Sequence, residues 1–213
     1  MRVILKTPRQ RRVGSVGSEC RVGRAGPAGE ARAALRVHPL AGPDDWQAAI
    51  TMLYDDAAFR EERYAAVVVL RTPRYAAHLR AAMPLMEHLL RTGAWWDLVD
   101  SVAPAAGAAL CRDRVVVEPL VRSWIGDPDR WLRRAAIICQ LGARGATDTR
   151  LLTDAIAANL PPTPGTQDFF IRKAIGWALR EHGKKDPEFV KRFVQDHPAL
   201  TPLSRREALR LLS

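Results

Sequence analysis

The chain has 213 residues, of which 47% are hydrophobic and 26% charged; this composition excludes a globally disordered protein and suits one domain or one short array of repeats. Its formal net charge of +10 suggests a polyanionic partner, provided that the charge lies on the folded part of the chain. No apolar run approaches the roughly 18 to 20 residues that cross a bilayer, and the apolar start is too short for a signal peptide, so we expect a cytoplasmic protein without membrane contact.

The N-terminal segment, residues 1–42, is basic and rich in glycine. Residues 1–36 hold nine Arg or Lys against two Glu, a charge of +7, which leaves only +3 for the other 177 residues. Because glycine interrupts apolar periodicity here, we expect an irregular segment apart from a helix around residues 30–37. Most of the net charge therefore lies outside the predicted folded domain, residues 43–213, and bulk charge says little about how that domain binds.

From residue 43 onward the sequence has the pattern of successive helices, with no alternating Val/Ile/Thr segment that would demand a sheet. The fold class is therefore all-α. The expected helices span 43–55, 58–70, 74–91, 95–110, 114–125, 128–142, 147–159, 167–182, 187–196 and 205–212.

Residues with capping chemistry mark several helix ends. Asp127–Pro128 and Asp186–Pro187 each place a capping carboxylate before a proline suited to the first helical turn. Ser204–Glu207 fits the capping box and is expected to open the last helix. Gly93 and Gly183 stand where a left-handed residue would end the preceding helix.

Pairing these helices gives units of about 35 to 40 residues, the length of HEAT-type repeats. Short helices joined by short loops form either a bundle or a solenoid, and no strict sequence repeat separates the two. The unit length favours the solenoid. We therefore expect a superhelical solenoid of HEAT-like antiparallel helix pairs.

The densest local signal is the hexapeptide WWDLVD at residues 95–100. On a helix, Trp96 and Asp100 are one turn apart and face the same way, whereas Trp95, Leu98 and Val99 can be used for packing. An aromatic face and a carboxylate then share one surface. Taken alone, the hexapeptide is better explained by core tryptophans and solvated or capping aspartates.

A second segment, WLRRAAII at residues 131–138, has the buried stripe of a helix with Arg133 and Arg134 at its edges. A surface arginine is the commoner outcome for such a position. The functional alternative is a phosphate clamp that uses the planar guanidinium fork.

A third segment, FFIRKAIGWALRE at residues 169–181, places Lys173, Trp177 and Arg180 on one helix face. Gly176, beside Trp177, leaves room for something to approach the backbone. A basic and aromatic stripe suits a nucleic-acid backbone, although a plain core tryptophan is the default interpretation of Trp177.

Metal chemistry finds no support in the sequence. The three cysteines, Cys20, Cys111 and Cys139, form no CxxC pair and have no nearby histidine pair, which argues against a disulfide framework and a zinc site. The five histidines also lack metal-ligand spacing. We expect neither a metal nor a cofactor.

The three segments, followed by LSRREAL at 203–209, occur together and in an order that resembles the DNA alkylation repair family of HEAT-like-repeat glycosylases, which act on 3-methyladenine and 7-methylguanine. The resemblance implies that Asp100 is the catalytic carboxylate. It also implies that Trp96 and Trp177 contact the deoxyribose of the lesion and its flanking backbone, and that Arg134 holds a nearby phosphate. Lys173 is placed on the same DNA-binding surface.

The chemistry explains why these residue types are needed. A purine alkylated at N3 or N7 is cationic and leaves readily, so its glycosidic bond breaks through an oxocarbenium-like sugar. A carboxylate stabilises that sugar and orients or deprotonates water, and indole faces attract the same charge. The resemblance implies that the damaged base stays stacked, and no base-pocket motif is found in the sequence.

Two functions remain open from the sequence. The first is a monofunctional DNA glycosylase that acts as a monomer on double-stranded DNA containing alkylated purines. It leaves an abasic site because no nucleophilic lysine is evident beside Asp100, with Lys173 as the one residue that could contradict this. The second is a non-catalytic helical-repeat module that binds DNA of unusual shape or a protein partner.

Overall fold

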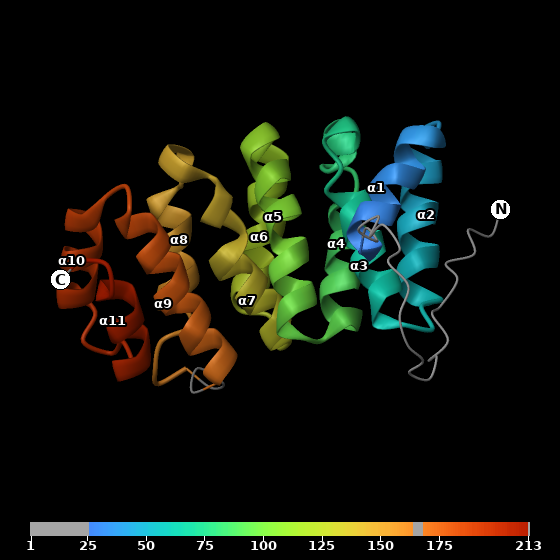
Figure 1. Cartoon of the computed structure of the whole chain (residues 1–213). Coiled ribbons are helices and arrows are strands. Elements are labelled where there is room, and N and C mark those ends of the chain that lie inside the picture. The colour runs from blue at the N-terminus through green and yellow to red at the C-terminus, as the bar shows by residue number, and fades with distance from the viewer. Residues whose placement is uncertain (1–25, 164–167, 213) are drawn as a thin grey trace, which may run out of the picture.

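A computed structural model describes residues 26–163 and 168–212 of the chain. Its α-helices and 3-10 helices (η) lie in one array that runs from α2 at one end to α10 and α11 at the other (Figure 1). In chain order they are α1 (Pro27–Val37), α2 (Pro43–Asp55), α3 (Arg60–Leu70), η1 (Pro73–His78), α4 (Met83–Gly93), α5 (Trp96–Arg112), α6 (Arg114–Ile125), α7 (Arg130–Ile138), η2 (Cys139–Gly142), η3 (Arg144–Ala146), α8 (Thr149–Ala157), α9 (Phe169–Gly183), α10 (Pro187–Asp196) and α11 (Pro202–Leu209).

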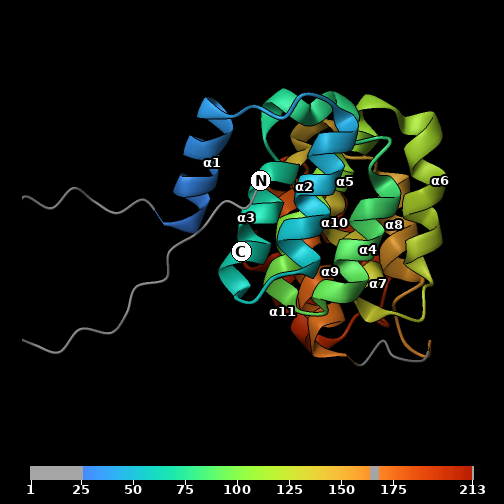
Figure 2. The same ribbon diagram turned by 90° about the vertical axis from the view of Figure 1, so that its right-hand side faces the viewer.

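From α3 onward, each odd-numbered helix packs against the next odd-numbered helix: α3 contacts α5, α5 contacts α7, α7 contacts α9 and α9 contacts α11. We call these five helices the odd-numbered row. Figure 2 shows α4, α6 and α8 on the opposite side of the array from α1 and α3. No strand occurs in the part of the chain that the structure describes, which confirms the all-α class and gives a helical repeat fold. The HEAT-like superhelix remains a prediction.

Hydrogen bonds between neighbouring helix pairs join residues that are 34 or 35 positions apart in the sequence. Tyr54 Oη donates to the carbonyl of Leu89 at 2.8 Å, across 35 residues. Asn159 Nδ2 donates to the carbonyl of Ile125 at 2.9 Å, across 34 residues. These separations agree with the unit of about 35 to 40 residues that the helix lengths predict, although the side chains involved differ from unit to unit.

One continuous apolar core follows the array from α2 to α11, with Trp46, Trp124 and Leu132 among its fully buried side chains. Several polar groups inside it are paired, as expected where water cannot reach them. Trp46 Nε1, for example, donates to the carbonyl of Val69 at 3.1 Å, whereas Asn159 Oδ1, Arg172 Nε and both ring nitrogens of His182 are buried without a hydrogen-bond partner among the described residues. The core fixes the relative positions of the helices that carry the candidate site.

The segment from residue 74 to 91, predicted as one helix, is two. It contains η1, a turn, and then α4, which begins at Met83 with a proline, Pro84, in its first turn. Pro84 fits only where its missing N–H is not needed, which is the start of a helix. The last three expected helices, by contrast, are present within a few residues of their predicted ends.

Several predicted caps are wrong in detail. Asp129, not Asp127, caps α7 by accepting from the Trp131 N–H. Thr201, not Ser204, caps α11, which therefore begins three residues before the predicted start at 205. Asp186 does cap α10, as predicted, by accepting from the Phe189 N–H.

The predicted left-handed glycines are also wrong. Gly93 is the last residue of α4, and the left-handed conformation belongs to Ala94, at φ 41°. A Cβ on Gly93 would lie 2.1 Å from Tyr54 Oη, so this glycine is needed for close packing. Gly183 has no positive φ either, and a Cβ there would meet Leu212 at 3.3 Å.

The N-terminal segment that was expected to be irregular holds α1 in the place of the expected helix. This helix packs on α3, and residues 1–25 of the segment lie outside the described residues. Within the described ranges, no helix is both long and apolar enough to cross a membrane.

Candidate active site

The start of α5 presents two tryptophans to solvent. Ala94 turns the chain with its positive φ and Trp95 is extended, so Trp96 is the first residue of the helix. Trp95 and Trp96 are 46% and 44% exposed, respectively. Trp95, expected to be available for packing, is therefore only partly covered, and its ring lies beside that of Phe170. Trp96 and Asp100 lie one turn apart on α5, in the arrangement that the sequence predicts.

Asp100 is held by Arg134 in a bidentate ion pair. Arg134 Nε donates to Asp100 Oδ1 and Nη2 donates to Oδ2, both at 2.7 Å. The two side chains are 6% and 14% exposed, respectively. Two parallel bonds from a planar guanidinium fix both the position and the plane of a carboxylate. The pair spans 34 residues and joins α5 to α7.

Arg134 is more deeply placed than the sequence indicates. It lies on α7, almost all of whose residues are buried between α5 and α9. Its Nη1 donates to the carbonyl of Phe170 at 2.6 Å, so all three of its nitrogens have acceptors in the protein. The edge position predicted for Arg134 is wrong, and its guanidinium is engaged by Asp100 rather than free on the surface.

An aromatic cluster adjoins this ion pair through Phe170. The ring of Phe170 lies 5.1 Å from that of Trp131, 5.6 Å from that of Phe169 and 6.2 Å from that of Trp95, measured between centroids. Since the Phe170 carbonyl also accepts from Arg134, this residue links α5, α7 and α9 beside Asp100. Sequence reasoning assigned Phe170 no role; the adjacent phenylalanines that open α9 were its only signal.

Asp97, three residues before Asp100 on α5, has different partners. It accepts hydrogen bonds from Arg60 and Tyr64 of α3. Burial raises the pKa of Asp97, but these hydrogen bonds outweigh burial and hold that pKa below its usual value. Asp97 therefore ties α5 to α3, and both of its carboxylate oxygens accept from donors of the protein.

Lys173 is also paired. Its Nζ donates to Glu207 Oε1 at 3.0 Å, and Arg180 Nη1 donates to Glu207 Oε2 at 2.5 Å. The hydrogen bond from Lys173 is the main reason why the pKa of Glu207 is lowered. The face shared by Lys173 and Arg180 is confirmed, but α11 covers it. Glu207, predicted for a capping box, serves as the common partner of two cations.

Gly176 accommodates the same helix. A Cβ on this residue would lie 2.5 Å from Glu207 Cβ and 3.1 Å from the carbonyl of Ser204. The close approach that the sequence predicts at Gly176 is therefore made by α11. Trp177, the next residue, is half-buried and packs on the core while keeping part of its ring accessible.

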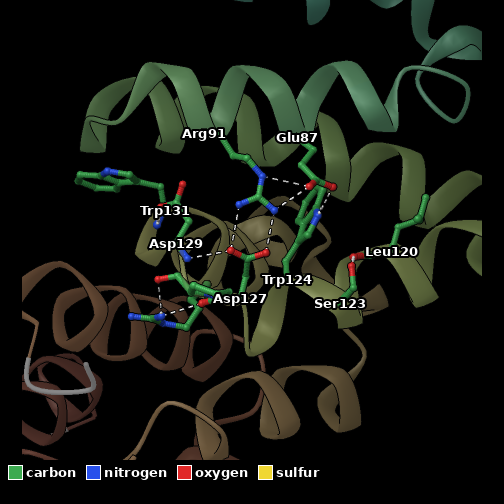
Figure 3. Close-up of polar contacts among 10 residues, drawn as sticks. Glu87, Arg91, Leu120, Ser123, Trp124, Asp127, Asp129 and Trp131 are labelled. Atoms are coloured by element: carbon green, nitrogen blue, oxygen red, sulfur yellow. Dashed lines mark hydrogen bonds and ion pairs between the residues drawn. The ribbon is translucent and has the colours of Figure 1, made fainter. Parts of the chain in front are cut away.

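A second arginine network lies between α4, α6 and α7, as Figure 3 shows. Arg91 donates to Asp127 at 2.8 Å and 3.0 Å and to Glu87 at 2.8 Å and 3.1 Å. Glu87 also accepts from Trp124 Nε1 at 3.1 Å. The hydrogen bond from Arg91 is the main cause that lowers the pKa of Asp127. This network explains why Asp127 does not cap α7.

The described residues contain no group of three or more His, Cys, Asp or Glu side chains that could hold a metal ion. Cys139 is buried, and its burial raises the pKa of the thiol to about 12, whereas Cys111 is exposed. The site is thus built from one carboxylate, one guanidinium and indole rings.

Comparison with known proteins bears on what this arrangement does. The model of the family described as "DNA alkylation repair enzyme" matches residues 29–212. The chain belongs to this family. A solved structure described as a predicted DNA alkylation repair enzyme from Enterococcus faecalis is similar, with a TM-score of 0.71 and 24% identity over 88% of this chain and 84% of that one. No curated protein sequence matches the chain.

The structure of this DNA alkylation repair family member groups the predicted site residues unequally. Asp100 and Arg134 are in direct contact, and Trp96 is one turn from Asp100. Trp177 lies on α9, two turns beyond the Phe170 that contacts Arg134. Lys173 is bound to Glu207. The core of the candidate site is therefore the Asp100–Arg134 pair, flanked by exposed tryptophans.

Proposed function

We propose that the chain is a monofunctional DNA N-glycosylase that removes cationic N3- and N7-alkylated purines from duplex DNA. One observation carries the proposal: the carboxylate of Asp100 is held in a fixed plane by two N–H groups of Arg134, beside the exposed Trp96. Membership of a DNA alkylation repair family supports the choice of substrate class. The chain acts as a monomer in the cytoplasm and needs neither a metal nor a cofactor.

The reaction requires little activation of the leaving group. The glycosidic bond breaks with its electron pair moving to the alkylated base, which leaves as a neutral molecule, while positive charge develops on the sugar. Asp100 stabilises that charge electrostatically. Water then adds to the sugar carbon and its proton passes to Asp100, which gives an abasic site.

Arg134 is the positioning residue for this carboxylate. Each carboxylate oxygen has two lone pairs, and the fork of Arg134 occupies one on each. A second acceptor site on each oxygen remains for the attacking water and the sugar. Because Arg134 is itself fixed by the Phe170 carbonyl, the orientation of Asp100 is set before DNA binds.

The tryptophans provide the other part of the binding surface. An indole face attracts a cation with about 0.5 to 2 kcal/mol, depending on how far the pair is desolvated. Trp96 is available for such contact from the first turn of α5. Trp177 contacts the backbone that flanks the lesion. The damaged base stays stacked in the duplex, and selectivity follows from its charge and its intrinsic lability.

Hydrolysis, not strand cleavage, is the expected outcome. A Schiff base with the sugar needs a free lysine beside the reacting carbon. Lys173, the candidate that the sequence raised, makes an ion pair with Glu207 of α11, whereas Arg134 of α7 binds the carbonyl of Phe170 at the start of α9. This pairing favours a binding or structural role for Lys173.

The test is base release from two duplexes that differ only in the lesion. Purified protein is incubated with DNA containing N7-methylguanine, and with DNA containing the neutral lesion uracil. We expect free N7-methylguanine above the spontaneous rate, no free uracil, and strand breaks only after alkali. Absence of enzymatic N7-methylguanine release would overturn the proposal. Salt-dependent DNA binding without any base release would favour the non-catalytic module instead.

A further inference from the structure

A basic region lies near the candidate active site, in a groove of about 780 Å³ between α1, α3 and η1. Arg32 and Arg36 line it from α1, and Arg71 and Arg74 line it from the end of α3 and from η1. All four arginines are exposed. No acidic residue lines the groove, so its charge is not neutralised locally.

These arginines differ from those that form ion pairs within the protein. Arg91, Arg122, Arg130 and Arg134 each form an ion pair with a carboxylate. Among the described residues, no hydrogen bond or ion pair engages the side chains of the four groove arginines. Four unpaired guanidinium groups around one groove repel one another, a cost that an anionic ligand relieves.

The walls of the groove are held in place. Helix α1 packs on α3, and Figure 2 shows it standing apart from the rest of the array on the side of α3. Leu35 and Leu40 are part-buried against the core. The N–H of Leu40 donates to Tyr75 Oη at 2.9 Å, which joins the segment after α1 to η1. The two pairs of arginines therefore face one groove from two fixed supports.

One end of the groove lies against α5, the helix that carries Asp100. Tyr64, which lines it, donates to Asp97, and Ser101, which also lines it, donates to the carbonyl of Asp97 at 2.6 Å. Ser101 is the neighbour of Asp100 in α5. A phosphate backbone that lies in the groove would thus continue toward the catalytic carboxylate.

We infer that this groove is a two-sided phosphate clamp that holds the backbone of duplex DNA on the N-terminal flank of the active site. Arg32 and Arg36 contact the phosphates from α1, and Arg71 and Arg74 contact them from the body of the protein. Guanidinium groups suit phosphate because their N–H donors match two of its oxygens. The inference rests on the proposed function only in taking duplex DNA as the partner.

The test compares charge removal inside and outside the groove. Affinity for an undamaged fluorescent duplex is measured by anisotropy between about 50 and 200 mM salt. The variants are R32Q/R36Q and R71Q/R74Q. The matched control is R150Q/R192Q, which removes the same charge from exposed residues of α8 and α10 that have no side-chain partner among the described residues.

We expect each groove variant to bind at least about tenfold more weakly and to lower the slope of log affinity against log salt by about 1 to 2. The control should bind nearly as the wild type does. Equal loss in all three variants would show a bulk charge effect and overturn the clamp. Wild-type binding by R32Q/R36Q would remove α1 from it and overturn its two-sided form.

This result is separable from that for the proposed function. The binding assay uses undamaged DNA, so it needs no base release. A protein that releases no base but loses affinity in the groove variants would refute the glycosylase and keep the clamp. If the protein releases base and all variants bind DNA equally well, the glycosylase is supported and the clamp is refuted. Thermal melting checks that each variant is folded, which is expected because the replaced side chains are exposed.

Discussion

Two arginine networks in this molecule are built at nearly the same sequence separation but in different surroundings. Arg134 and Asp100 are 34 residues apart, and their side chains are 6% and 14% exposed, respectively. Arg91 and Asp127 are 36 residues apart, with 41% and 13% exposure. The helical repeat supplies such partner positions again and again. The burial of the arginine and the exposed Trp95 and Trp96 nearby, not the ion pair itself, distinguish the candidate site.

Replacing Asp100 should have the largest effect. D100N keeps the size of the side chain but removes the negative charge that stabilises the sugar and accepts a proton. We expect base release from N7-methylguanine duplexes to fall by about 10² to 10⁴, with DNA affinity changed by less than about twofold, a difference of about 0.4 kcal/mol. Single-turnover kinetics and anisotropy measure the two effects. Wild-type activity in D100N would show that the carboxylate is not catalytic.

The buried pair should also matter for stability. R134M leaves Asp100 without its partner in a largely buried position, and we expect it to lower the free energy of unfolding by about 3 to 5 kcal/mol. The double variant D100L/R134M removes both charges and should be less destabilised than R134M alone, although it too should be inactive. Urea denaturation measures the free energy of unfolding of the two variants. If the two variants are equally unstable, uncompensated charge is not the cause.

Close packing within the odd-numbered row offers a third test. A Cβ on Gly176 would meet Glu207 Cβ at 2.5 Å, so G176A should push α11 away from α9 and cost roughly 1 to 3 kcal/mol. Gly126, after α6, has nothing within 4 Å of an added Cβ, so G126A should change stability by less than about 0.5 kcal/mol. Equal melting temperatures for G176A and the wild type would contradict this packing.

The exposed network should give the smallest effect. R91Q should lower the free energy of unfolding by at most about 1 kcal/mol at pH 7, because exposed ion pairs are weak. The pKa of Asp127 is lowered in the folded protein, chiefly by the hydrogen bond from Arg91. The stabilisation from its ion pair is therefore present above the ordinary aspartate pKa of 3.8 and is lost as pH falls through the lowered pKa of the folded protein. The stability difference between R91Q and the wild type should begin to shrink as pH falls below about 4 and vanish only below the lowered pKa of Asp127; a constant difference at all pH values would contradict this origin.

The groove arginines and Arg91 make a further contrast between structural and functional charge. Arg91 has two carboxylate partners, whereas Arg71 and Arg74 have none among the described residues. A surface arginine that is already paired adds little to DNA binding, since its ion pair must first be broken. Net charge alone, which is concentrated in residues 1–36, does not show this difference.

Much of the helical architecture could be predicted because it depends on local patterns. The buried stripes and the prolines placed α2, α6 and α10 with the observed ends. The caps at Asp127 and Ser204 were wrong for a physical reason. Several polar residues stood close enough to cap each helix, and hydrogen bonds to distant residues decided which of them did so. Arg91 donates to Asp127, and the hydroxyl of Ser204 donates to the carbonyl of Arg172.

The sequence by itself determined the all-α class, the length of the repeat unit and the shared helix face of Trp96 and Asp100, because contacts three or four residues apart decide these features. Only the tertiary structure decided that Arg134 is buried against Asp100, that Glu207 covers Lys173, and that α1 and η1 enclose a basic groove. The first two join residues 34 positions apart. No local pattern encodes such partners, since they meet only when neighbouring helix pairs stack.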